Sequence, residues 1–283
     1  MRKYKNLPKE VDTLKDLYNN KSIPTHPYTF SIFAINTHKD LKSKKISPKS
    51  GYGEKLSTIY NDYMYTNVLQ IEKELQFFSY INEEIASRYD VLNKDIQKLF
   101  TKHISSTFRN IWKIKEDINL LLFPNVLSVG HSFGIFHNND IFSISAPIVN
   151  KDSSIEFNQQ NIISNAIHEY SHCILQKSLI KKKKLSYIKD ILVNIEIPTK
   201  LQTIHARPEI YIEELFIKVL TLFIQEAIFA NFMTAEEITV KRKKNLEVMV
   251  DNGYSYAPLF FSKLDKNISP VDTYIEIAEA IQN

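Results

Sequence analysis

The chain has 283 residues, of which 43% are hydrophobic and 24% charged, with a formal net charge of +4. This composition can supply a large core and excludes a mainly disordered chain, and the length suits one large domain or two small ones. The single cysteine, Cys173, excludes an internal disulfide framework and any Cys-rich metal site.

The chain carries no sign of a membrane or nucleic-acid partner. No apolar run reaches the roughly 18 to 20 residues of a membrane-spanning helix, and the start at Met1 is charged rather than apolar. We therefore expect no membrane span, no signal peptide and a cytoplasmic location. The lysines at 181–184 are interpreted as a solvated loop, because no nucleic-acid-binding signature accompanies them.

The first part of the chain is predicted to be mainly helical. Residues 28–35 are rich in β-branched and aromatic side chains, which predicts one early strand, and the polar stretch 38–53 predicts a loop. From about residue 54 to 121, apolar side chains recur every three or four residues, as in helices. We expect residues 1–121 to form a helical N-terminal region.

A small sheet and further helices are predicted to follow, in residues 122–283. Residues 126–129, 133–136 and 141–145 are short β-like runs, with a turn at 137–140 between the last two. Everything after about Glu156 has helical character, with capping-box-like starts at Thr234 and Ser269 and an end at Gly253. The fold class expected is α+β with helix dominant, in two regions or in one continuous domain.

One motif carries chemistry. His168, Glu169 and His172 form HExxH, and histidines four residues apart on a helix lie on one face, where both imidazoles can reach one zinc ion. Glu169 is then placed to take a proton from a metal-activated water. Chance would produce this motif in such a chain roughly 0.02 times, so two incidental surface histidines are the less favoured interpretation.

The helical pattern around the motif supports this interpretation. At about 100° per residue, both histidines share a stripe with polar side chains, whereas the apolar side chains of residues 162–174 point to the opposite side. Such a helix is expected to form the floor of a cleft.

A third zinc ligand is expected from residues 208–231, a strong helix with Pro208 in its first turn. Glu213 lies on the border of its apolar stripe, where a carboxylate needs a partner, and is the favoured ligand. Glu226 lies on the other border and is the alternative. Glu214 is expected to face solvent and to pair with Lys218 one turn later.

The motif followed by a downstream glutamate resembles the gluzincin branch of zinc metallopeptidases, over roughly Val126 to Asn231. The latter half is also similar to poorly characterised bacterial proteins with such a motif. The resemblance implies a zincin-like catalytic region, a single Zn²⁺ held by His168, His172 and Glu213, and Glu169 as general base. It also implies that a sheet edge holds an extended peptide, for which 133–136 or 141–145 are candidates.

The sequence therefore predicts a zinc metallohydrolase, most simply a peptidase acting on a peptide or protein. Neither Glu213 nor Glu226 is followed four residues later by an acidic residue that could orient a ligand histidine. Candidates for the donor to the developing oxyanion are His205, Tyr211, Tyr254 and Tyr256.

Two other functions stay open. The chain could be a non-catalytic zincin-like module that binds metal and whose residues 54–121 recognise a partner. It could also be a purely structural helical protein, which would bind no metal. Substrate identity, oligomeric state and the choice between Glu213 and Glu226 are not decided by the sequence.

Overall fold

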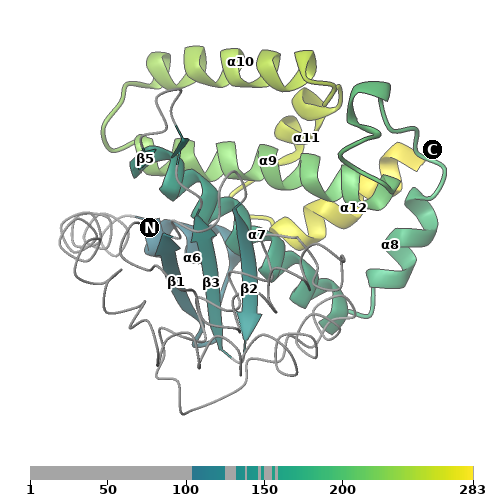
Figure 1. Ribbon diagram of the computed structural model, residues 1–283, viewed down its shortest axis with the longest axis horizontal. Coiled ribbons are helices and arrows are strands. Elements are labelled where there is room, and N and C mark those ends of the chain that lie inside the picture. Colours follow the sequence, from purple (N-terminus) through teal and green to yellow (C-terminus); the bar gives the residue numbers. More distant parts are fainter. Residues whose placement is uncertain are drawn as a thin grey trace, which may run out of the picture.

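The computed structural model describes residues 104–124, 132–137, 139–145, 148–149, 155–156 and 159–282 (Figure 1). The elements in chain order are α6 (Ser105–Trp112), β1 (Asn119–Pro124), β2 (Phe133–His137), β3 (Asp140–Ser145), β4 (Ile148–Val149), β5 (Ile155–Glu156), α7 (Gln159–Lys181), α8 (Leu185–Leu192), the 3₁₀ turn η3 (Thr199–Leu201), α9 (Pro208–Phe229), α10 (Ala235–Asp251), α11 (Ala257–Lys263) and α12 (Pro270–Gln282). The predicted strands 28–35 and 126–129, and the helical pattern at 54–103, lie outside the described residues.

The larger sheet has three strands in the order β1-β3-β2. β2 and β3 form the predicted hairpin, pairing antiparallel with Phe133 opposite Ile144 and His137 opposite Asp140. β1 pairs parallel with β3, from Asn119 opposite Asp140 onward, so the sheet is mixed. In the described residues β3 is central and β2 is an outer strand.

Helix α7 lies against this sheet at very close range. A Cβ atom added to Gly134 of β2 would lie 2.6 Å from the carbonyl oxygen of Glu169 and 2.9 Å from the Sγ atom of Cys173. Only glycine leaves room for such an approach of helix to strand. Gly134 therefore fixes the spacing between β2 and the helix that carries the HExxH motif.

Helix α9 is the most buried of the described helices. Half of its 22 residues are buried, from Tyr211 to Ile228, and they lie on more than one side of the helix. It contacts α7 along one side and α11 and α12 along others, as Figure 1 shows. Its strong apolar character, which the sequence predicted, places it at the centre of the core.

Helix α6 belongs to the same core. The Phe108 ring packs edge-on against Tyr170 of α7, with ring centroids 5.9 Å apart. The indole Nε1 of Trp112 donates a hydrogen bond to Ser171 Oγ at 3.2 Å. The described part of the predicted N-terminal region is thus joined to α7 by buried contacts.

Helix α10 is attached differently, since none of its 17 residues is buried. It runs beside α9 across the top of Figure 1. Arg242 holds it to α9 by hydrogen bonds from Nε and Nη2 to both carboxylate oxygens of Glu226, at 2.6 to 3.1 Å. The guanidinium of Arg242 also lies over the Phe261 ring of α11, at 4.8 Å. This cluster attaches α10 together with the partly buried side chains of Leu246 and Met249, which pack against the core.

The expected fold class is confirmed, because the described part is α+β with helix dominant. The capping box at Thr234 with Glu237 is present, and Gly253 has a φ of 99° directly after the end of α10. The expectation that helix continues to Leu121 is wrong. Helix α6 ends in a left-handed Lys113, and the apolar run from Asn119 instead pairs with β3, a non-local partner that periodicity does not reveal.

We predict that Arg242→Met loosens α10 without unfolding the core, and that it costs about 1 kcal/mol of stability because a bidentate ion pair is lost. Amide hydrogen exchange within 235–251 should become faster. Lys243→Met is the matched control, since Lys243 contacts Glu247 only at 4.0 Å and both side chains are exposed. Equal exchange rates in the two variants would contradict the assigned role of Arg242.

Candidate metal centre

Helix α7 presents the two histidines of the motif on one side. Its opposite side is buried through residues that include Ile167, Tyr170 and Ile174, so the helix cannot rotate without exposing them. The side chains of His168 and His172 keep 17% and 22% of their surface exposed. The predicted polar stripe therefore faces a partly open site.

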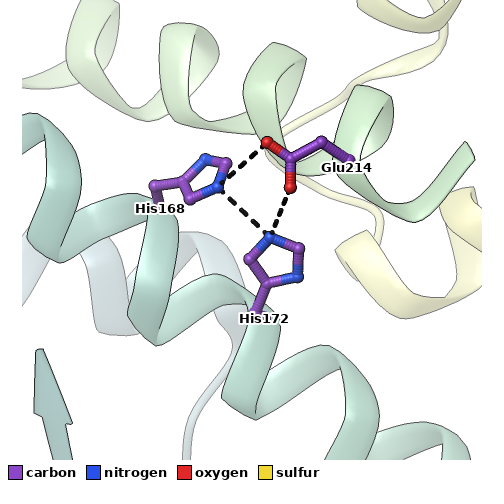
Figure 2. A group of neighbouring side chains, drawn as sticks. All are labelled: His168, His172 and Glu214. Atoms are coloured by element: carbon purple, nitrogen blue, oxygen red, sulfur yellow. Dashed lines mark hydrogen bonds and ion pairs between the residues drawn. The ribbon is translucent and has the colours of Figure 1, made fainter. Parts of the chain in front are cut away.

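The two imidazoles and one carboxylate converge there (Figure 2). The Nε2 atoms of His168 and His172 lie 3.2 Å apart. Glu214 of α9 places Oε2 3.1 Å from Nε2 of His172 and Oε1 3.5 Å from Nε2 of His168. These three side chains form a group whose ligand atoms all lie within 4.8 Å of one another, and they could hold a metal ion.

Glu213, the predicted third ligand, lies elsewhere on the same ring. Its Oε1 accepts a hydrogen bond from Nδ1 of His172 at 2.8 Å, and a second from Gln176 Nε2 at 3.2 Å. When Nε2 of His172 gives up its proton, as metal binding requires, the Nδ1 proton stays hydrogen-bonded to Glu213 and the lone pair of Nε2 points toward Glu214 and His168. Glu213 thus orients His172 and fixes its tautomer, a role for which the sequence had suggested no acidic residue.

The prediction that Glu214 faces solvent is wrong, because only 21% of its side chain is exposed and it contacts both histidines. The sequence argument assumed that α9 has one buried side. Ile217 and Thr221, on the same side of the helix as Glu214, are also buried. A helix buried on several sides has no solvent face opposite its main apolar stripe, and Glu214 instead faces α7.

The predicted pair of Glu214 with Lys218 is present, with Nζ 2.9 Å from Oε1. Burial by itself raises the pKa of Glu214, but contacts with His168, His172 and Lys218 lower it well below its usual range. Burial likewise lowers the pKa of His172, but Glu213 and Glu214 outweigh this effect and raise it to about 10. The two carboxylates of Glu213 and Glu214 therefore stabilise a positive charge on or beside the His172 ring, either a second ring proton on Nε2 or a metal ion in its place.

Glu169 lies beside the two histidines and next to the sheet. Burial raises the pKa of its carboxyl group, and the neighbouring histidines and a hydrogen bond from the Gly134 backbone amide oppose that rise. A carboxylate with a raised pKa is a better proton acceptor than one in water. Glu169 is thus a candidate base.

A pocket of about 470 Å³ opens beside these residues, within the 300 to 1,000 Å³ range usual for small-ligand sites. His168 and Glu169 line it together with Tyr254. Its other walls come from α7, α9 and α10 through Ser164, Asn165, Lys218, Thr221, Leu222, Gln225, Asn245, Val248, Met249 and Asn252. Asn165 lies on the polar stripe expected from the sequence, whereas the amides of Gln225, Asn245 and Asn252 are distant from the motif in the chain and could not be grouped with it.

Of the other predicted site residues, only Tyr254 lines the pocket. Glu226 is bound to Arg242, as a salt-bridged border carboxylate, and does not belong to the histidine group. Tyr254 lines the pocket, and its hydroxyl lies 3.0 Å from Nε2 of His205. The Tyr211 hydroxyl donates to the Gly253 carbonyl, and Tyr256 is 38% exposed. The other three candidate donors to the oxyanion, His205, Tyr211 and Tyr256, do not line the pocket.

Comparisons of the chain with family models, curated proteins and solved structures found no match. Within the described residues, none of the helices combines the length and apolar character needed to cross a bilayer.

We predict an asymmetry between the two adjacent glutamates in zinc binding. Glu213→Gln should lower zinc affinity about 10- to 100-fold, because it weakens the orientation of His172. Glu214→Gln should lower it further, because it removes a charged donor atom. Competition titration against a chromogenic chelator measures both.

Glu209→Gln is the matched control on the same helix, because Glu209 pairs with Arg207. It should bind zinc as the unaltered chain does. A larger loss for Glu213→Gln than for Glu214→Gln would instead identify Glu213 as the ligand.

Proposed function

We propose that this protein is a zinc-dependent, zincin-like metallohydrolase that cleaves peptide bonds. The observation that carries the proposal is the triangle of donor atoms from His168, His172 and Glu214, with Glu169 beside it. Two neutral imidazoles and one carboxylate are a usual protein ligand set for a catalytic zinc ion, which leaves a fourth position for water.

The spacing of the three donors fits such an ion. Ligand bonds of about 2.0 to 2.1 Å at tetrahedral angles place neighbouring donor atoms about 3.3 Å apart. The two Nε2 atoms lie 3.2 Å apart, and each oxygen of the Glu214 carboxylate lies at a similar distance from one of them, Oε2 at 3.1 Å from His172 and Oε1 at 3.5 Å from His168. Two lone pairs and a carboxylate oxygen at this distance repel one another unless a proton or a cation lies between them, so a metal ion could take the place of the proton on His172.

A zinc ion bound there would polarise a carbonyl group and lower the pKa of a water molecule to about 7. Glu169 would accept the proton of the attacking water and deliver it to the leaving amine, as general base and then general acid. Its burial raises the pKa of its carboxyl group, which suits both halves of this exchange. Glu213 would hold His172 in the required tautomer through Nδ1.

The position of β2 supports a peptide as the substrate. A peptide can bind as an added strand at the outer edge of a sheet. The segment 141–145 is excluded as that edge, because β3 is paired on both sides. Among the described residues β2 is an outer strand, and its Gly134 amide donates to the Glu169 carboxylate. A peptide added along β2 would therefore lie next to the proposed base.

Tyr254 is the best placed of the candidate donors to the developing oxyanion. It lines the pocket with His168 and Glu169, and its ring stacks on Tyr211 with centroids 5.9 Å apart. When Nε2–H of His205 donates to the Tyr254 hydroxyl oxygen, 3.0 Å away, the hydroxyl proton is left for the substrate. Burial raises the pKa of Tyr254 and keeps that proton in place.

We predict that Glu169→Gln binds one zinc ion as tightly as the unaltered chain and loses at least about 1,000-fold in hydrolysis, since general base catalysis is removed. Cleavage of an unfolded protein, with and without a chelator, measures this alongside metal content. Full turnover in Glu169→Gln would refute the mechanism. Stoichiometric zinc without hydrolysis in the unaltered chain would favour the non-catalytic module.

We predict that Tyr254→Phe lowers kcat by about 10- to 100-fold and leaves zinc affinity unchanged, because it removes one hydrogen bond made in the transition state. Tyr256→Phe is the control, since Tyr256 is exposed and does not line the pocket. Steady-state kinetics decide between the two, and an unchanged kcat in Tyr254→Phe would remove Tyr254 from the mechanism.

A further inference from the structure

We propose that the pocket beside the metal centre selects a substrate residue with a carboxamide side chain, glutamine above asparagine, next to the bond that is cut. This inference rests on the proposed hydrolase function. It is carried by the chemistry of the pocket walls away from the metal ligands.

Four carboxamides line the pocket, of which Asn165 of α7 donates a hydrogen bond to Ser132 and the other three lie on those walls. Gln225 comes from α9, Asn245 from α10 and Asn252 from the end of α10. In the part of the chain that the structure describes, none of these three side chains has a hydrogen-bond partner. Each offers two N–H donors and one acceptor oxygen to whatever enters the pocket.

The charges around the pocket argue against a charged side chain. Lys218 is the cation in the lining, and its Nζ is paired with Glu214 at 2.9 Å. Glu169 is the carboxylate, and the proposed mechanism needs it for the proton. A substrate carboxylate or ammonium group would thus lose hydration without gaining a free counter-ion, which is unfavourable.

An apolar substrate side chain also fits less well, because of its effect on the amides of the pocket. It would cover amide groups that are otherwise hydrated and leave them without partners. The apolar part of the lining, Leu222, Val248 and Met249, can contact methylene groups. A glutamine side chain satisfies both kinds of wall, because it carries two methylenes and then a group that both donates and accepts.

The size of the preference follows from the exposure of the amides. Asn252 is exposed and the other two are partly buried, so each hydrogen bond competes with water. A net gain typical of such bonds corresponds to about a ten-fold preference, well below that of a fully enclosed polar site.

The test uses peptides of one sequence in which the residues on either side of the cut bond are varied in turn. Glutamine is compared with methionine, which has a similar shape without the amide, and with glutamate, which has a similar shape with a charge. We expect kcat/KM for glutamine to exceed both by about ten-fold at one of the two positions.

Gln225→Leu and Asn245→Leu should each reduce the glutamine-to-methionine ratio to about 2 or less, and because the residues lie on different helices, one variant can replace the other if it fails to fold. Asn194→Leu, which changes an exposed amide outside the pocket lining, should keep the ratio. Cleavage with equal rates, or with methionine or glutamate preferred, overturns this inference alone. No cleavage above the level of Glu169→Gln overturns the proposed function, and this inference with it.

Discussion

The candidate site depends on the placement of two adjacent carboxylates against one imidazole ring. Glu213 and Glu214 lie in a partly buried position between α7 and α9, where each negative charge needs a positive or donating partner. Glu213 meets Nδ1–H of His172, and Glu214 meets Lys218 and the Nε2 side of both histidines. The space between the donor atoms of His168, His172 and Glu214 is surrounded by electron-rich atoms, so a cation is favoured there.

Adjacent residues of a helix diverge by about 100°, so two of them rarely serve one group. They do so here because the ring of His172 lies between the two side chains and its nitrogens point in opposite directions. Glu213 reaches one nitrogen and Glu214 the other. Nδ1 of this imidazole binds the carboxylate that orients the ring, and Nε2 faces the other carboxylate of the site. An acidic residue one turn after the third ligand, which the sequence lacks, is therefore not needed to orient the ring.

The sequence predicted what is local and missed what depends on packing. The HExxH motif, the β2–β3 hairpin and the capping box at Thr234 follow from spacing within a few residues, and the described structure contains them. The third carboxylate could not be chosen in this way, because the choice between Glu213 and Glu214 depends on which sides of α9 are covered. The same holds for β1, whose partner β3 is distant in sequence.

The two halves of the site differ in how firmly they are held. The proposed metal ligands come from α7 and α9, which share the core and which Gly134 and Trp112 tie to the sheet and to α6. One wall of the pocket comes from α10, which has no fully buried residue and is held by the Arg242 ion pair and by the partly buried Leu246 and Met249. Movement or substitution in α10 therefore changes the pocket without displacing the histidines, since no ligand side chain comes from it. Such an arrangement lets the shape of the pocket vary while the spacing of the donor atoms stays fixed.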